Sequence, residues 1–378
     1  MALTPDPTLY TITNPMEAMM KHKHRSKKMA LGGAAVAIAA LLLSGCATTD
    51  PASNPTPTGD ESKAPAQLVP FTVAFGFLQN YEYAGSYIAD DSGLYAKAGL
   101  DMKFLGGGPN APAPEVSITS GEAVVSYESN TSRLFSYLAK ADDIVIIGQQ
   151  SQEAPNGLLS LAKHPVRTAD ELKGARIIAG AQNKASIGAL MTINGVKDYT
   201  FVPGGADVGP LLAGQGDAML AFATNQPITL EQQGLKEGTD FFFTPFSELN
   251  YHLISDVVIV SKAYLESNRD DVVNYMAATI QGWEEQLKDP AKGAKLAVEK
   301  YGADLGLNLE QQTAAAKAAI PYMTSELTKS KGLFAIDPAA IEKNVYPGLT
   351  LAGITNLPDV NKVIDTTVLE DAYKKLGK

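Results

Sequence analysis

Amide, hydroxyl, carboxylate and tyrosine side chains gather in short segments that each follow a β-rich run. The clearest segments are 78–83 (LQNYEY), 128–132 (ESNTS), 181–186 (AQNKAS) and 224–227 (TNQP). Their polar groups donate and accept hydrogen bonds. A tyrosine ring can in addition stack on a planar ligand, at a gain of roughly 0.5 to 1.5 kcal/mol beyond area burial. These residue types favour the binding of a small polar or aromatic molecule.

The first two segments supply candidates that each have a plainer alternative. Tyr81 or Tyr83 can present a ring to a ligand or pack beneath its own loop, and Asn80 can offer an amide or cap the following helix. Glu128 can accept hydrogen bonds from a ring amine or remain a surface carboxylate. Asn130 can belong to a polar wall or serve as a helix N-cap.

The later segments add candidates for a second wall. Segment 181–186 opens a helix whose backbone donors can meet an anion, with Lys184 and Ser186 helping. A dianion would normally draw an arginine, and none of the polar loops contains one. A neutral or weakly cationic planar ligand is therefore favoured, with Tyr251 closing its other face. The candidates here are Gln182, Asn183, Asn225, Gln226 and Tyr251.

Catalytic and metal-binding patterns are missing from the sequence. Cys46 is the one cysteine, no G-x-S-x-G or P-loop motif occurs, and His22 and His24 fall in a basic N-terminal tract. The formal net charge of −10 argues against nucleic acid as a partner. We expect no catalytic residues, no cofactor and no metal, hence a binding protein rather than an enzyme.

The elements that must position these side chains alternate between strands and helices, as in an α/β protein with largely parallel sheets. Residues 71–77 predict a buried strand, and 82–99 a helix that ends on glycine. A second α/β series begins near residue 168, and the chain becomes mainly helical after residue 262. Open α/β sheets bind ligands beyond the carboxyl ends of their strands, so the polar loops should line a cleft between two lobes.

Four motifs follow one another along the chain, namely GLYAKAGL (93–100), VRTADELKGARIIAG (166–180), LLAGQGDAMLAFATNQP (211–227) and VVNYMAATIQGWEEQLKDP (272–290). In this order they resemble the motifs of ABC-importer solute-binding proteins of the sulfonate, nitrate and thiamine-pyrimidine type (NMT1/THI5-like). The resemblance implies a type II periplasmic-binding-protein-like α/β fold, in which two lobes, each a mostly parallel sheet flanked by helices, enclose the ligand cleft. It also implies a small-molecule ligand, an ABC permease as partner and a monomer.

Within that family the sequence is most similar to receptors for aromatic heterocycles, meaning thiamine pyrimidine precursors or riboflavin. Pyrimidine receptors carry an aromatic-Asn-Glu triplet where this chain has Thr224, Asn225 and Gln226. The glutamine can both donate and accept, whereas a carboxylate can only accept, which predicts a different ligand edge. The alternatives are an alkanesulfonate or nitrate receptor that uses Lys184, and an enzyme of pyrimidine synthesis, whose cysteine-rich motif this chain lacks.

The N-terminal region resembles a bacterial lipoprotein signal. A basic tract at 21–28 precedes a short apolar run, and Leu43-Ser44-Gly45-Cys46 resembles a lipobox. We expect Cys46 to be lipidated and to anchor the protein to the cell membrane on its extracytoplasmic face. The expected organisation is a signal peptide with an extension (1–45), a disordered tether (46–68), the first part of lobe 1 (69–160), lobe 2 (161–250), and a return to lobe 1 with C-terminal helices (251–378).

Overall fold

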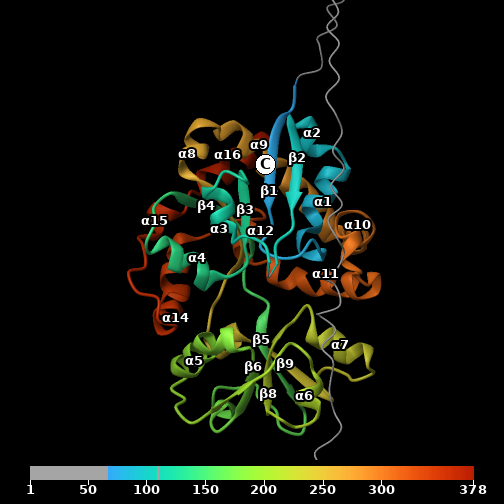
Figure 1. Cartoon of the computed structure of the whole chain (residues 1–378), viewed down its shortest axis with the longest axis vertical. Coiled ribbons are helices and arrows are strands. Elements are labelled where there is room, and N and C mark those ends of the chain that lie inside the picture. Colours follow the sequence, from blue (N-terminus) through green and yellow to red (C-terminus); the bar gives the residue numbers. More distant parts are fainter. Residues whose placement is uncertain (1–66, 109) are drawn as a thin grey trace, which may run out of the picture. The chain divides into compact units, whose positions relative to one another are not determined.

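Strands and helices alternate along the part of the chain that the computed structural model describes, residues 67–108 and 110–378 (Figure 1). The predicted lipid-attachment residue Cys46 and the signal before it lie outside these residues. Within the described ranges, no helix combines the length and apolar character that crossing a membrane requires.

The first sheet has the strand order β2-β1-β3-β10-β4. Strand β1 pairs in parallel with both β2 and β3, whereas β10 is antiparallel to both β3 and β4. Four of its strands therefore run in one direction and β10 alone is reversed. The strands are β1 (Val69–Ala74), β2 (Leu100–Leu105), β3 (Val125–Glu128), β4 (Ile144–Ser151) and β10 (Ser255–Ser261).

The second sheet repeats this plan in the order β7-β6-β8-β5-β9, with β5 as its reversed strand. The reversed strands are the two that follow a crossing between the sheets, from β4 to β5 and from β9 to β10. Two mostly parallel sheets flanked by helices were predicted, and this is confirmed. The strands are β5 (Asn156–Leu161), β6 (Arg176–Ala179), β7 (Thr200–Pro203), β8 (Ala218–Phe222) and β9 (Phe241–Pro245).

Helices cover both sheets, and those after β10 stack mainly against the first sheet (Figure 1). Those that follow strands up to β9 are α1 (Ala84–Asp91), α2 (Leu94–Lys97), α3 (Pro114–Thr119), α4 (Thr131–Leu138), α5 (Lys184–Ile193), α6 (Gly209–Leu212) and α7 (Gln226–Gln232). The later ones are α8 (Lys262–Ser267), α9 (Arg269–Lys288), α10 (Pro290–Leu296), α11 (Leu309–Met323), α12 (Glu326–Lys331), α13 (Pro338–Ala340), α14 (Tyr346–Leu351), α15 (Val360–Val363) and α16 (Thr367–Lys375).

The helix expected over 82–99 is divided into α1 and α2. Gly93 has a φ of +68°, a left-handed conformation that glycine adopts without steric cost and that ends α1. The short turn Tyr81–Tyr83, capped by Asn80, precedes α1. This break lets α2 turn Tyr95 into the core, where its hydroxyl pairs with that of Thr279 at 2.8 Å.

Helices α1 and α9 approach one another closely at glycine. A Cβ atom on Gly282 would lie 2.1 Å from the carbonyl oxygen of Gly85, and one on Gly85 would lie 2.3 Å from the Trp283 ring. Real Cβ atoms do not come so close to other heavy atoms, and neither the Gly85 backbone nor the rigid indole ring can yield easily, so both positions require glycine. The contact fixes Trp283 beside the turn that carries Asn80 and Tyr81.

Candidate functional site

A cavity of about 780 Å³ lies where polar loops of both sheets meet. Loops that follow β1, β3, β6 and β8 line it, together with both crossings between the sheets. These are the strand ends at which the sequence pattern predicts a ligand cleft. The candidates that line the cavity are Asn80, Tyr81, Asn130, Gln182, Asn183, Asn225 and Gln226.

Tyr83 and Tyr251 do not line the cavity, which corrects their assignment as ligand contacts. Tyr83 is fully buried and stacks on Phe75 with ring centroids 3.9 Å apart. Its hydroxyl accepts a hydrogen bond from the backbone N–H of Phe77 at 2.9 Å. Tyr251 is also fully buried and stacks on Phe246. Both rings therefore pack beneath their loops and do not face the cavity.

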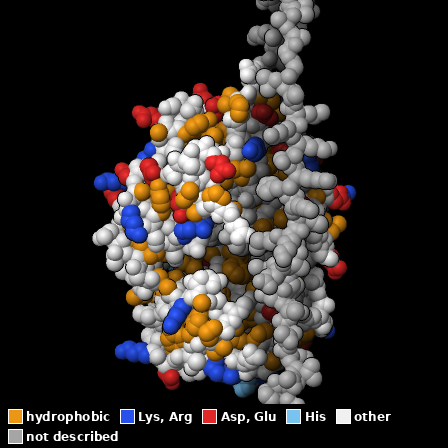
Figure 2. Space-filling view, viewed as in Figure 1, with side chains coloured by type: hydrophobic (Ala, Val, Ile, Leu, Met, Phe, Trp, Pro, Cys, Tyr) orange, Lys and Arg blue, Asp and Glu red, His pale blue; other side chains and the backbone are white. Residues whose placement is uncertain are grey.

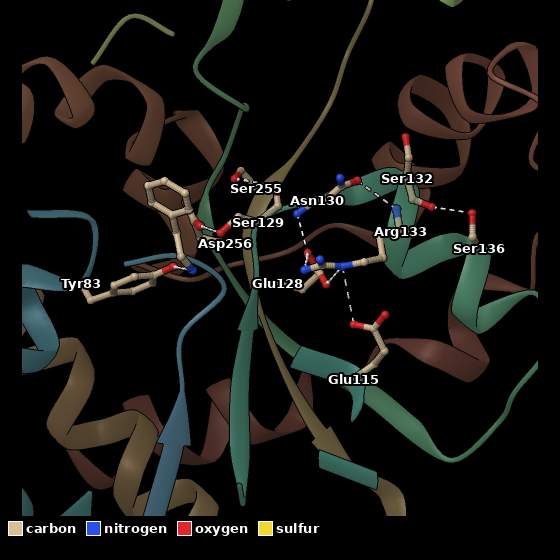
Figure 3. A network of polar contacts seen from close by, with 11 residues as sticks. Tyr83, Glu115, Glu128, Ser129, Asn130, Ser132, Arg133, Ser136, Ser255 and Asp256 are labelled. Carbon is tan, nitrogen blue, oxygen red and sulfur yellow. Dashed lines mark hydrogen bonds and ion pairs between the residues drawn. The ribbon is translucent and has the colours of Figure 1, made fainter. Parts of the chain in front are cut away.

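Glu128 does not line the cavity either, because it is fully buried in an ion pair (Figure 3). The Arg133 guanidinium donates two hydrogen bonds of 2.8 Å to its carboxylate, and the backbone N–H of Asn130 donates a third at 2.6 Å. Burial raises the pKa of Glu128 to about 7, although Arg133 opposes the rise. Arg133 also lies 3.7 Å from the buried Glu115. Its single positive charge is thus shared by two glutamates.

Asn80 and Asn130 cap helical segments as well as lining the cavity. The Asn80 side-chain oxygen accepts from the backbone N–H of Glu82 at 2.8 Å, and that of Asn130 accepts from the N–H of Arg133 at 2.9 Å. Capping therefore occupies the oxygen of each amide. A role of their NH₂ groups in ligand binding stays a prediction.

Phe77 and Phe222 are aromatic rings at the cavity that the sequence interpretation missed. Phe77 follows β1 and Phe222 ends β8, so they come from different sheets. Their side chains are 44% and 38% exposed, unusually high for phenylalanine, and both line the cavity. The sequence could have indicated both residues, because each phenylalanine stands at the carboxyl end of a predicted strand, where ligands of α/β sheets bind.

Helices α9 and α11 form a wall that the sequence interpretation also missed. Trp283 and Gln286 of α9 line the cavity, as do Gln312 and Tyr322 of α11. Gln312 accepts a hydrogen bond from the backbone N–H of Tyr81 at 3.0 Å, which ties α11 to the turn before α1. The prediction considered only loops that lead from strand to helix, whereas these residues lie on the C-terminal helices.

The carboxyl groups of the half-buried Glu82 and the buried Asp256 reach the cavity and both contact Ser129. The Ser129 hydroxyl lies 2.6 Å from Asp256 Oδ1 and 3.1 Å from Glu82 Oε1. Asp256 has a φ of +52°, a conformation that costs about 1 kcal/mol or more in a non-glycine residue. Burial, the nearby Asp256 charge and a hydrogen bond with Asp256 raise the pKa of Glu82 well above its ordinary value.

Charge in the cavity is acidic or already paired. Among the described residues that line it, Arg133 is the one lysine or arginine, and the acids are Glu82 and Asp256. Lys184 is exposed and outside the lining. Acidic and basic side chains are scattered over the face seen in Figure 2, without a patch of either sign. No group of three His, Cys, Asp or Glu side chains in 67–108 and 110–378 is placed to hold a metal.

Gln226 holds its loop through both ends of its amide. Its oxygen accepts from the backbone N–H of Phe222 at 2.9 Å, and its NH₂ group donates to the carbonyl of Ala206 at 3.2 Å. The side chain is almost fully buried. A carboxylate could replace the acceptor but not the donor, which gives a physical reason for glutamine at this position.

Replacing Gln226 with glutamate should therefore lower the free energy of unfolding by about 1 to 3 kcal/mol, because a buried carboxylate oxygen would face the Ala206 carbonyl. Urea denaturation measures the change. The exposed Gln232 at the other end of α7 provides the control, since Gln232→Glu should shift stability by no more than about 0.5 kcal/mol. Equal effects at both positions would contradict the assigned hydrogen bonds.

Comparison with known proteins identifies a matching family and a relative of low sequence identity. A family model described as NMT1/THI5 like matches residues 80–293. The chain is 24% identical over 315 residues to the riboflavin-binding protein RibY of Chloroflexus aurantiacus, covering 78% of this chain and 84% of that protein.

Solved structures share the fold at low sequence identity. A putative periplasmic sulfonate-binding protein SsuA from Methylobacillus flagellatus superposes with a TM-score of 0.60 at 12% identity, covering 82% of this chain and 96% of that one. The desulfurization enzyme DSZB superposes with a TM-score of 0.53 at 13% identity, covering 81% and 99%. Both a binding protein and an enzyme therefore have this architecture.

Proposed function

This chain belongs to the NMT1/THI5-like family, and from that premise we propose that it is the solute-binding protein of an ABC importer that captures a small aromatic heterocycle. The ligand is a thiamine pyrimidine precursor or a flavin-like ring. It enters the cavity between the sheets and is delivered to a permease chemically unchanged. Lobe closure follows from differential contacts that the ligand makes in the closed state.

The observation that carries the proposal is the pair of half-exposed rings, Phe77 and Phe222, at a cavity otherwise rich in amides. Apolar rings that stay exposed at a cavity are costly in water and gain by stacking on a planar ligand. Amide side chains can then read the polar edge of the ring. The riboflavin-binding relative supports the choice of a heterocycle.

The anion alternative lacks a free cation in the described lining. Arg133 is committed to Glu128 and Glu115, and Lys184 lies outside the cavity. A sulfonate would also meet the carboxyl groups of Glu82 and Asp256, and like charges repel strongly at low dielectric. These charges favour a neutral or weakly cationic ligand.

Isothermal titration calorimetry of the purified full chain tests the proposal. The panel is 4-amino-5-hydroxymethyl-2-methylpyrimidine, riboflavin, taurine and nitrate. One of the two rings should bind with a stoichiometry of one, and neither anion should bind. Binding of taurine or nitrate alone would refute the heterocycle proposal. Recovery of the bound ring in altered form after prolonged incubation would refute simple delivery.

Replacing Lys184 with alanine separates the two candidates. We expect the affinity for the ring to change less than about twofold, because Lys184 is exposed and outside the cavity. An anion receptor that relied on this lysine would lose binding. Calorimetry with the same panel gives the result, and the likewise exposed Lys197→Ala serves as the matched control.

We also propose that Cys46 carries the lipid anchor on the extracytoplasmic face of the membrane. Support comes from the lipobox-like Leu43-Ser44-Gly45-Cys46, which lies outside the described residues. Cys46→Ala should move the protein from the membrane fraction to the soluble fraction on cell fractionation. Retention of the variant in the membrane fraction would contradict lipid attachment at this residue.

A further inference from the structure

The Ser129 hydroxyl joins the carboxyl groups of Glu82 and Asp256 at the cavity. The Ser129 hydroxyl lies within hydrogen-bond distance of both carboxyls but has one hydrogen to give. Burial and the nearby Asp256 raise the pKa of Glu82, which favours its protonated form. Asp256 also accepts from Ser151 at 2.9 Å, and Glu82 accepts from the Tyr83 hydroxyl at 3.1 Å. Asp256 thus has two hydroxyl partners, Ser129 and Ser151.

The surroundings of Glu82 leave the pair with one negative charge. The titratable groups that face it are Asp256 from β10, Tyr81 and Tyr83 from its own turn, and Tyr87 from α1. None of these is a cation. Two adjacent carboxylates would repel strongly, and protonation of Glu82 relieves that repulsion. A buried, uncompensated negative charge remains beside the cavity.

Gln150 provides an independent sign that a ligand group belongs here. Its side chain is 3% exposed, lines the cavity and donates from Nε2 to the backbone carbonyl of Glu82 at 2.9 Å. A carbonyl can only accept, so this contact fixes the amide orientation. The amide oxygen then has no hydrogen-bond partner in the described part of the chain. A buried acceptor without a partner costs about 1 to 3 kcal/mol, which a donor from a ligand would offset.

Trp283 adds one donor at the same end of the cavity. Its side chain is 2% exposed, lines the cavity and packs against Gly85, three residues after Glu82. The indole N–H likewise has no acceptor among the described residues. One end of the cavity thus has three acceptors, on Glu82, Asp256 and Gln150, and one donor on Trp283. This set matches a ligand that carries N–H groups next to a ring acceptor.

We propose that Glu82, Asp256 and the Gln150 amide oxygen form an acceptor site that binds the N–H edge of a nitrogen heterocycle. The inference rests on the proposed function and deepens it by naming the edge of the ring that is read. A ring amine or imide N–H donates to these acceptors, and the Trp283 N–H meets a neighbouring ring nitrogen or carbonyl. Rings without an N–H donor leave the acceptors unpaired and bind poorly.

Paired ligands test this site without altering the protein. The first pair is 4-amino-5-hydroxymethyl-2-methylpyrimidine and its 4-dimethylamino counterpart, and the second is riboflavin and its N3-methyl derivative. In each pair methylation removes the N–H and keeps the ring. Calorimetry on the wild-type full chain should show at least about a tenfold loss of affinity on methylation of the ring that binds.

Substitutions then locate the effect. In Asp256→Asn, which removes the charged acceptor, and in Glu82→Ala, which removes the neutral one, the affinity gap between the N–H ligand and its methylated partner should shrink by at least about threefold. The exposed Glu122 gives a matched control, and Glu122→Gln should keep the full gap. If the acids had a purely structural role, the variants would lose affinity for both ligands equally, and the affinity gap would be unchanged. Thermal unfolding checks that each variant is folded. The affinity gap of the wild-type protein is measured without any substitution and does not depend on that check.

The outcomes separate this inference from the proposed function. A gap that shrinks in the acid variants supports both. A ring that binds equally well with or without its N–H, or a gap that persists in the acid variants, overturns the acceptor site and leaves the heterocycle receptor standing. Failure of both rings to bind overturns the receptor proposal, and the acceptor site with it.

Discussion

Replacing Arg133 with methionine is expected to lower the free energy of unfolding by about 3 kcal/mol near pH 8. The substitution removes the two hydrogen bonds and the charge that pair the fully buried Glu128, and an uncompensated buried carboxylate is strongly destabilising. We place the value at the low end of the range for buried pairs because the Arg133 side chain is 41% exposed. Urea denaturation measures it.

The pH dependence of this loss has a definite sign. The pKa of Glu128 in the folded protein is about 7, above its ordinary 4.5, so its contribution to stability is full below pH 4.5 and is lost as pH rises through 7. Without Arg133 the folded pKa rises further. The gap between wild type and Arg133→Met should therefore be smaller near pH 5 and grow by up to about 1.4 kcal/mol per pH unit above pH 7.

Two control variants accompany this prediction. Arg133→Lys keeps the charge but not the forked hydrogen bonds and should cost less than methionine. Adding Glu128→Gln to Arg133→Met removes the carboxylate and should recover part of the loss near pH 8. A loss that is the same at pH 5 and pH 8 would show that ionisation of Glu128 is not its cause.

Replacing Gly282 with alanine is expected to lower the free energy of unfolding by about 3 kcal/mol. The added Cβ would lie 2.1 Å from the Gly85 carbonyl and 2.8 Å from the Ala89 Cβ, so α9 and α1 must separate. Overpacking that shifts backbone costs roughly 1 to 3 kcal/mol and occasionally more. The same movement would displace Trp283 from its place beside the cavity.

Gly205 provides the matched control for this prediction. A Cβ there meets nothing within 4 Å, and its φ lies outside the left-handed range. Gly205→Ala should therefore leave stability unchanged or raise it slightly, since alanine restricts the unfolded chain. An equal loss of stability for the two variants in urea denaturation would show that crowding between α1 and α9 is not the cause.

The architecture was largely predictable from the sequence, because strand and helix periodicities and four ordered motifs each point to the same fold. The pattern did not predict the reversal of β5 and β10. Both are short, mostly apolar and buried segments, and such segments do not encode direction. Their direction follows from the two crossings between the sheets, which only the tertiary structure defines.

The site was predictable at the level of loops but not of side chains. Asn80 and Tyr81 line the cavity while Tyr83, two residues further on, is buried under Phe75. Which tyrosine of a short turn points inward depends on packing with distant residues. The same limit explains Glu128, which looks like a free carboxylate until the first turn of α4 brings Arg133 onto it.

The acidic pair Glu82 and Asp256 could not be predicted from the sequence for a different reason. Glu82 and Asp256 are far apart in the sequence, and each alone resembles an ordinary surface acid. Their proximity arises because β10 returns beside β3 and brings Asp256 next to Ser129. Sequence periodicity carries no information on that pairing.

Fluorescence of Trp283 offers the most direct test of the central claim that a heterocycle binds in this cavity. Trp283 is the one tryptophan of the chain and lines the cavity, so its emission reports on this site alone. Titration of the full chain with the aminopyrimidine or with riboflavin should give a saturable change at one ligand per chain, and taurine and nitrate should give none. A saturable change with an anion and none with either ring would contradict the account.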